Sequence, residues 1–190
     1  MMLLGDIFQV RSGLVVARKK VTTKDDAKFK YKQLNLRSIN KNGYINLEDI
    51  EVFQSDEKIN YDYLTAVGDI IIRLSEPYTA IYITKEYENL VITSNFAVIK
   101  RSNLYNSEFI AYYLNGDFVK KQLYSNMQGS IVRSISISSI EKIELPKLTK
   151  HKQEMFAKLA EILSNKLRIT EEIKNLELKL QKNIIDKMSI

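Results

Sequence analysis

The sequence predicts an α+β protein in which a mixed α/β globular domain over residues 1–149 is followed by one long helix over residues 150–190. Short apolar runs, rich in β-branched residues and bounded by polar or turn residues, occur throughout the first part and are typical of strands. After Pro146 neither Gly nor Pro occurs in the remaining 44 residues, and apolar side chains there recur with heptad spacing. A chain of 190 residues, 45% hydrophobic and 27% charged, can bury one good core.

Strand patterns dominate the first part. The apolar runs lie at residues 67–74, 80–84, 90–99 and 131–137, and the last of them alternates with a period close to two. Asn42-Gly43 separates the apolar stretches 36–39 and 44–47, which is the strongest hairpin signal in the chain. We therefore expect several short strands and one tight hairpin.

Two short helices interrupt these strands. Ser107-Glu108 can cap a helix that Gly116 would end. Asp117 can cap the next helix, which has Phe118 and Val119 on its apolar side. The domain is therefore predicted to be mixed rather than all-β.

Residues 150–190 predict a single helix with an apolar seam. A helix over 150–187 would be roughly 55 Å long, which exceeds a domain of this size. The seam residues are spaced alternately four and three apart, as in a coiled coil, and comprise Met155, Leu159, Ile162, Lys166, Ile169, Ile173, Leu176 and Leu180. An isolated helix gains little from propensity alone, so we expect the seam to dimerise; packing of the helix on its own domain is the alternative. Phe156, Leu163 and Leu167 widen the seam near its start, where we expect broader packing.

The net charge of +6 is unevenly distributed. Residues 1–41 hold ten Lys or Arg against three Asp or Glu, whereas residues 42–72 hold one against seven. A basic block beside an acidic one can be an electrostatic footprint for phosphates, with the acidic part turned elsewhere. A solvated surface with scattered lysines is the alternative.

Composition excludes several classes of protein. Cysteine is absent, which excludes disulfides, thiolate zinc sites and a cysteine nucleophile. No stretch approaches the ~20 uncharged apolar residues of a membrane helix, and no signal peptide is visible because Asp6 follows the opening apolar residues at once. We expect a cytoplasmic protein without membrane contact.

No catalytic constellation is found in the sequence. None of the six glycines lies within two positions of another, so a dinucleotide fingerprint and a P-loop are both missing. Ser75-Glu76-Pro77-Tyr78 resembles the amino-methyltransferase motif only superficially, because Glu76 replaces the first proline, and we interpret Pro77-Tyr78 as turn and packing. His151 is the only histidine and cannot by itself build a metal site or a catalytic triad. We expect a binding protein with no cofactor, no metal and no enzymatic activity.

Several short segments follow one another in a distinctive order along nearly the whole chain. The segments near the start are Leu4-Gly5-Asp6-Ile7-Phe8 with Arg11-Ser12-Gly13, and Leu36-Arg37-Ser38-Ile39 with Asn42-Gly43-Tyr44-Ile45. The apolar runs at residues 67–73 and 92–99 come next. The most specific stretch is Gln128-Gly129-Ser130-Ile131-Val132-Arg133, followed by Ile140, Ile143, Leu145-Pro146, Leu148 and Gln153. In this order the segments resemble the specificity subunits of type I restriction–modification systems, in which the two apolar runs would be central strands.

The resemblance implies a half-length specificity subunit. A full-length family member carries two recognition domains and two conserved helices with pseudo-twofold symmetry, whereas this chain has one of each. Residues 1–149 would then be a target-recognition domain, and residues 150–190 a dimerisation and spacer helix that forms an antiparallel coiled coil in a homodimer. Each domain would read one half of a bipartite, palindromic site in double-stranded DNA. Catalysis would belong to DNA methyltransferase subunits and to a restriction/translocase subunit where one exists.

DNA recognition needs basic side chains for phosphates, and Arg, Asn, Gln, Ser or Thr for base edges. The phosphate candidates lie in a loop-like tract and are Arg18, Lys19, Lys20, Lys24, Lys28 and Lys30. The base-reading candidates flank turns or strand ends and are Arg73, Thr79, Asn126, Gln128, Ser130, Arg133 and Ser134. For each arginine, a surface ion pair is the alternative role.

Two other functions remain open from the sequence. One is a coiled-coil adaptor that recruits a protein without DNA specificity, whose binding need not depend steeply on salt. An enzyme that modifies DNA itself would need a cofactor site, which the sequence lacks.

Overall fold

The computed structural model describes residues 2–16, 28–125 and 134–188 of the chain. The strands are β1 (Met2–Leu3), β2 (Val10–Ser12), β3 (Phe29–Gln33), β4 (Glu51–Ser55), β5 (Ile70–Arg73), β6 (Ala80–Tyr82), β7 (Leu90–Val91), β8 (Phe96–Ile99) and β9 (Glu144–Leu145). The α-helices are α1 (Leu4–Ile7), α2 (Ser107–Leu114), α3 (Asp117–Ser125), α4 (Ile137–Glu141) and α5 (Lys150–Met188). Short 3-10 helices lie at Leu47–Asp49, Tyr61–Tyr63 and Lys85–Tyr87.

A four-stranded antiparallel sheet forms the centre of the domain, in the order β2-β8-β5-β6. Every residue of the run Ile70, Ile71 and Ile72 is fully buried, because both faces of this sheet are covered. Ile70 and Ile72 face a cluster built with α2, α3 and α4. Ile71 faces a second cluster that includes Ile39, Ile45 and Ile92. The central β-branched run is therefore a strand that is covered on both sides.

The second sheet has three strands in the order β4-β3-β7 and mixes an antiparallel with a parallel pair. It encloses a smaller core around Phe53, Leu64 and Val91. The loop at Gly13 packs closely against the segment between β7 and β8, since a Cβ on Gly13 would lie 2.2 Å from the Thr93 carbonyl oxygen. Only glycine can occupy this position without moving the backbone.

The helices cover the other face of the central sheet. Asn106 caps α2 by accepting a hydrogen bond from the Phe109 N–H at 2.9 Å. At the other end of α2, the Asn115 side chain pairs with both backbone groups of Ala80 on the edge strand β6, at 2.9 and 2.8 Å. This bidentate pair fixes α2 against the sheet edge.

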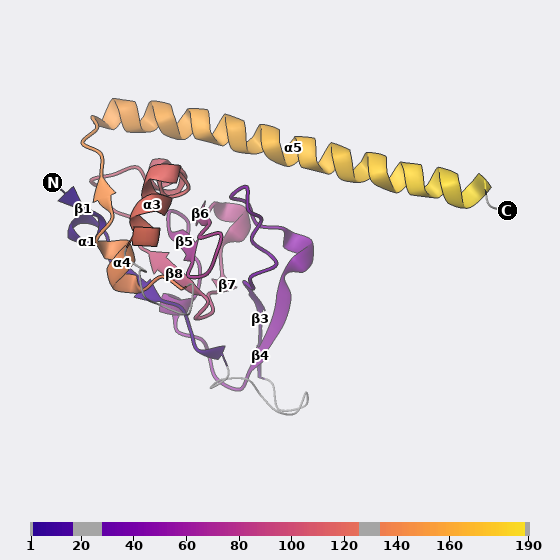
Figure 1. Ribbon diagram of the computed structural model, residues 1–190. Coiled ribbons are helices and arrows are strands. Elements are labelled where there is room, and N and C mark those ends of the chain that lie inside the picture. Colours follow the sequence, from indigo (N-terminus) through magenta and orange to yellow (C-terminus); the bar gives the residue numbers. More distant parts are fainter. Residues whose placement is uncertain (1, 17–27, 126–133, 189–190) are drawn as a thin grey trace.

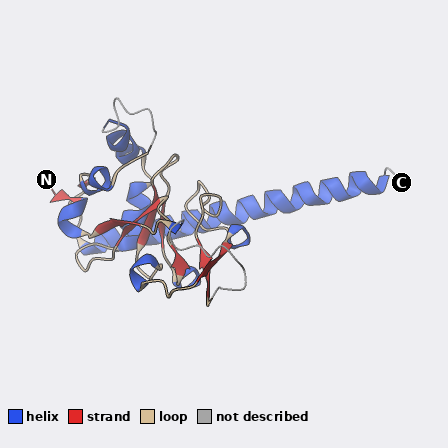
Figure 2. Ribbon diagram, turned by 90° about the horizontal axis from the view of Figure 1, so that it is seen from below, coloured by secondary structure: helices blue, strands red, loops and turns tan. Residues whose placement is uncertain are grey.

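Helix α5 lies across the domain and then continues far beyond it (Figure 1). Its 39 residues correspond to about 58 Å at 1.5 Å per residue. The view turned by 90° shows the same projecting end, so the overhang is not an effect of one viewpoint (Figure 2). The predicted α+β fold and its long C-terminal helix are thus confirmed.

Several predicted elements differ in detail from the observed ones. The expected strand at 90–99 is two strands, β7 and β8, separated by a turn at residues 92–95. The Asn42-Gly43 turn forms, with Gly43 at φ +87°, but only the single bridge Ile39–Ile45 flanks it. Of the expected strand at 131–137, residues 131–133 lie outside the described residues, Ser134 makes one bridge to Ser75, and Ile137 already begins α4. Strands β3 and β4 were not predicted from the sequence.

Candidate nucleic-acid interface and helix surfaces

Helix α5 has two faces that differ in what covers them. One face meets the domain through Gln153, Ala157 and Ala160, which are 3%, 3% and 6% exposed. At about 100° per residue, these positions lie on the opposite side of the helix from the predicted seam. The alternative that the helix packs on its own domain is therefore correct for part of its length, but the seam is not the surface that does so.

The seam itself points away from the domain and is uncovered in this single chain. Its seven apolar members are between 48% and 64% exposed: Met155, Leu159, Ile162, Ile169, Ile173, Leu176 and Leu180. Lys166 is exposed among them. Monomeric proteins rarely leave a continuous apolar stripe of this length without a partner.

Gln153 anchors the start of α5. Its amide oxygen accepts a hydrogen bond from the Asn106 N–H at 2.8 Å, and its amide nitrogen donates to the Leu148 carbonyl at 3.1 Å. Asn106 is the N-cap of α2, and Leu148 lies just before α5. One buried side chain therefore joins α5 to the start of α2 and to the segment that leads into α5. Phe109 and Phe156 add a ring contact with centroids 6.2 Å apart.

A hollow of about 480 Å³ lies beside this anchor. Its lining is mostly aromatic or apolar and includes Phe109, Tyr112, Phe118, Leu148 and Phe156. Phe118 is 59% exposed and Tyr112 is 50% exposed, so the hollow is open to solvent. Helix α5 contributes Phe156 to its lining, a residue that widens the predicted seam near its start.

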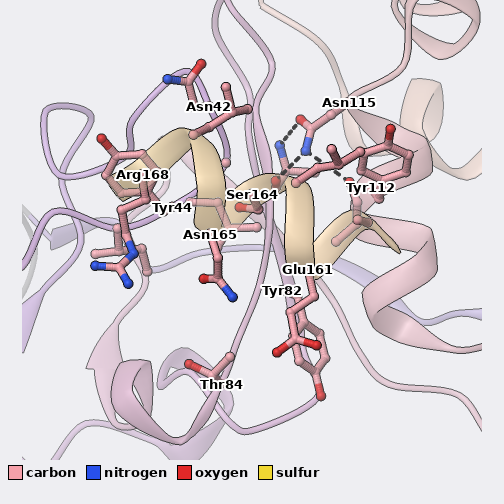
Figure 3. A pocket seen from close by; sticks show the side chains of 18 of the residues that line it. Asn42, Tyr44, Tyr82, Thr84, Tyr112, Asn115, Glu161, Ser164, Asn165 and Arg168 are labelled. Carbon is pink, nitrogen blue, oxygen red and sulfur yellow. Dashed lines mark hydrogen bonds between the residues drawn. The ribbon is translucent and has the colours of Figure 1, made fainter. Parts of the chain in front are cut away.

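A groove of about 1040 Å³ separates the middle of α5 from the domain. Figure 3 shows Glu161 and Arg168 of α5 lying beside Tyr82, Tyr44 and Asn42 of the domain. Burial and the nearby charge of Glu161 raise the pKa of Glu108, which lines the same groove. Acidic and basic side chains both line the groove, so its charge does not favour the phosphates of DNA.

Most of the predicted DNA contacts lie outside the described residues. These are Arg18, Lys19, Lys20, Lys24, Asn126, Gln128, Ser130 and Arg133. The described candidates fall into two groups. Lys28 and Lys30 lie at or beside the start of β3 in the three-stranded sheet, whereas Arg73, Thr79 and Ser134 lie near the end of β5 in the four-stranded sheet.

The group at the end of β5 is connected through the backbone. The Arg73 N–H donates to the Thr79 carbonyl at 3.0 Å, and Ser134 bridges Ser75 just beyond β5. Burial lowers the pKa of Arg73, and its Nε has no hydrogen-bond partner among the described residues. Thr79 is 1% exposed, so its hydroxyl is the least suited of the group to reach a base. Arg73 and the exposed Ser134 remain candidates.

The described parts of the basic and acidic blocks of the sequence are neighbours in space. Strand β3, which carries two lysines, pairs with β4, which begins at Glu51. Two ion pairs join the blocks, Arg11–Asp62 and Arg37–Glu51, both at 2.9 Å. The acidic block is therefore not turned away from the basic one, and part of the basic charge is neutralised within the fold. Lys28 and Lys30 have no ion pair among the described residues and stay exposed.

Two features of the described residues bear on other functions. No group of three or more His, Asp or Glu is placed to hold a metal ion in the part of the chain that the structure describes. In the same part of the chain, no helix combines the length and the apolar character needed to span a bilayer.

Comparison with known proteins identifies the fold. No protein-family model matches the sequence. A chain of the type I R-M system, solved to explain complex assembly and conformational transition, is 17% identical; the match covers 96% of this chain and 45% of that chain, with a TM-score of 0.62. The HsdS subunit from Thermoanaerobacter tengcongensis is 15% identical, with coverages of 96% and 45% and a TM-score of 0.63. The S subunit of a type I restriction-modification system from M. genitalium is 17% identical, with coverages of 93% and 42% and a TM-score of 0.55.

This chain thus spans somewhat less than half of the length of these solved chains. The similarity nevertheless includes almost all of it, domain and long helix together. The chain has the fold of type I restriction–modification specificity subunits, as the sequence resemblance indicated.

Proposed function

We propose that this chain is a non-catalytic, sequence-specific DNA-binding specificity subunit of a type I restriction–modification system. Residues 1–149 are its target-recognition domain, and residues 150–190 are its dimerisation and spacer helix. Two copies pair through α5, and each reads one half of a bipartite palindromic site. The pair presents this site to methyltransferase subunits and, where the system has one, to a restriction subunit.

The observation that carries the proposal is the match of nearly the whole chain to somewhat less than half of each specificity subunit. A chain with one domain and one helix of this fold can rebuild a two-domain arrangement by pairing with a copy of itself. Pairing needs a self-complementary surface, and the uncovered seam of α5 supplies a candidate.

The residue types in the seam favour antiparallel pairing. In a parallel pair, Lys166 would face Lys166 of the second copy, which places two like charges in the seam. In an antiparallel pair about the middle of the seam, Lys166 faces Ile169, and Met155 faces Leu180. The end of one α5, with exposed Ile184 and Met188, then reaches the apolar hollow beside the start of the other.

Antiparallel pairing also determines the symmetry of the DNA site. The two domains lie on opposite sides of the paired helices, displaced toward opposite ends, and are related by a two-fold axis. A two-fold protein reads two identical half-sites in opposite orientation, so the site is palindromic and its spacer is set by the helices.

Selection from a randomised DNA library tests the proposal. The full chain is incubated with random duplexes, bound molecules are sequenced, and the affinity of the selected site is measured at several salt concentrations. We expect a palindromic site with an unselected spacer and an affinity that falls steeply with salt. Recovery of no sequence preference would refute the DNA-reading function, and salt-insensitive capture of a protein instead would favour the adaptor.

Removal of two charges at β3 tests whether this strand contacts the DNA phosphates. Lys28→Gln with Lys30→Gln is expected to weaken binding to all sequences alike and to reduce the salt dependence by about two counterions, because each phosphate contact contributes about 0.9 to the slope. Lys179→Gln, on the exposed end of α5, serves as the control. If both variants retain the full slope, the two lysines of β3 do not contact phosphate.

A further inference from the structure

Glu171 connects α5 to the domain at a second point, far from the anchor at Gln153. Its Oε2 accepts hydrogen bonds from the Tyr44 hydroxyl at 2.7 Å, from Asn42 Nδ2 at 3.1 Å and from Asn40 Nδ2 at 3.5 Å. All three donors belong to the turn at residues 40–44. We name Glu171 with these three residues the latch.

The turn that supplies the donors is rigid. Asn40 N–H donates to the Tyr44 carbonyl at 2.9 Å, and the Asn40 side chain accepts from the Asn42 N–H at 2.9 Å. Gly43 holds a positive φ of 87°, which favours glycine. Ile39 and Ile45, at either end of the turn, are 3% and 4% exposed and lie in the second core cluster. The donors are therefore preorganised before Glu171 arrives.

The protonation states of the latch agree with its geometry. The Tyr44 hydrogen bond is the largest cause that lowers the pKa of Glu171, and Asn42, Asn40 and Lys41 lower it further. Burial, together with the same hydrogen bond and the charge of Glu171, raises the pKa of Tyr44 to about 12. Near neutral pH, an ionised carboxylate thus accepts from a neutral hydroxyl.

The latch contacts α5 far along the helix from its anchored start. Glu171 lies eighteen positions after Gln153, which corresponds to about 27 Å of helix, and the open groove lies between them. The helix therefore touches the domain over its first turns, from Gln153 to Ala160, and again at Glu171. The contact of the first turns fixes only the near end of α5, whereas the second contact determines the direction of the rest of the helix.

Stability is not the main effect of such a contact. A polar contact near the surface adds little to the free energy of folding, and α5 is already held at its start by buried residues. The direction of α5 depends more strongly on the Glu171 contact, because the helix continues to Met188, about 26 Å beyond Glu171. A displacement at the latch therefore approximately doubles at the end of the helix.

We propose that Glu171 is a positioning residue that fixes the angle between α5 and the domain and, through this angle, the spacing between the two half-sites. The second part rests on the proposed function; the first part does not. In B-DNA one base pair advances the helix by about 3.4 Å and turns it by about 34°. A swing of a few ångströms at each domain is therefore enough to change the preferred spacing.

Distance measurement between two spin labels tests the first part. The chain has no cysteine, so Lys142→Cys on the domain and Lys182→Cys on the projecting end of α5, both exposed positions, give two unique labels. Labelled chain is diluted with unlabelled chain so that only distances within one chain are observed. The latch is removed by Glu171→Ala or Tyr44→Phe, and Glu177→Ala is the matched control.

We expect the distance distribution to broaden and its mean to shift in Glu171→Ala and Tyr44→Phe, but not in Glu177→Ala. Thermal unfolding of all variants shows whether the domain is intact. If both latch variants fold and retain the distribution of the parent chain, Glu171 does not position α5 and the inference fails.

Selection from half-site libraries with variable spacers tests the second part. In Glu171→Ala the half-site sequence is expected to stay the same, while the preferred spacing widens or moves by about one base pair or more. An unchanged spacing with intact half-site binding would overturn the link between the latch and the spacer. If the parent chain selects no sequence at all, the proposed function fails together with this link, and the spin-label distances still decide the first part.

Discussion

The two faces of α5 differ in what they contact and in how much they bury. The face toward the domain carries a glutamine and two alanines that are nearly inaccessible, followed by the carboxylate of Glu171 on the turn at residues 40–44. The face away from the domain carries long aliphatic side chains that are about half exposed. Small residues allow close approach to the domain, whereas large apolar ones gain free energy only when a partner covers them. The difference is what we expect of a helix that packs on its own domain with one face and on a partner with the other.

Breaking the outward face should have the largest effect. In a symmetric dimer each substitution acts twice, and each buried aliphatic side chain contributes about 1.5–3 kcal/mol. We expect Ile169→Asp with Ile173→Asp to raise the dimer dissociation constant by about a thousandfold or more, as measured by analytical ultracentrifugation. The unfolding of the domain should be unaffected, and an unchanged dissociation constant would show that the seam is not the dimer interface.

Breaking the inward face at Gln153 should have the next largest effect, but on folding rather than pairing. Gln153→Leu leaves the Asn106 N–H and the Leu148 carbonyl without their partner. Loss of a hydrogen-bond partner for buried groups destabilises by about 1–3 kcal/mol. Urea unfolding measures this loss, with exposed Lys152→Ala as control. Equal stability of the two variants would mean that the anchor does not hold the helix.

Replacing the one polar residue of the seam with an apolar one should strengthen pairing moderately. Polar residues in a coiled-coil seam reduce stability in exchange for a defined register. We expect Lys166→Leu to lower the dissociation constant about tenfold, whereas Lys174→Leu, to the side of the seam, changes it little. Weaker pairing of Lys166→Leu would place Lys166 outside the interface or in a favourable contact there.

The smallest effect concerns the pH dependence of the latch. Because the folded-state pKa of Glu171 lies below its ordinary value of 4.5, the latch is fully stabilising above that value and weakens as pH falls through the folded-state pKa. Tyr44→Phe should move the Glu171 pKa back toward 4.5, since the Tyr44 hydroxyl is the largest cause of the shift. Carbon-13 NMR of the Glu171 carboxyl measures both values. The same pKa in both chains would mean that the hydrogen bond is absent in solution.

The sequence was sufficient for the elements whose pattern is local. Helix α5 was predicted at 150–187 from its spacing and is observed at Lys150–Met188, and the short helices and the central strands were found near their predicted positions. Strands β3 and β4 were missed because residues such as Lys30 and Glu51 give them the pattern of charged loops. These strands form through pairing with segments distant in the sequence, and the periodicity of a short segment does not encode such tertiary contacts.

The site was less accessible to sequence reasoning. The seam was recognisable because its period is local, but Glu171 has the pattern of an ordinary charged helix residue. Only the fold brings it to Asn42 and Tyr44, more than 120 positions earlier in the chain. The Asn42-Gly43 turn was the available signal: a tight turn rich in side-chain donors is a place where a carboxylate can bind. Base contact by Arg73 or Ser134 stays a prediction.

The molar mass of the intact chain in solution, measured by light scattering over a range of concentrations, tests the central claim most directly. If the outward face of α5 pairs two copies, the mass will be twice 22.1 kDa, and Ile169→Asp with Ile173→Asp will return it to that of one chain. A mass of 22.1 kDa for the parent chain at all concentrations would contradict the homodimer and, with it, the palindromic site.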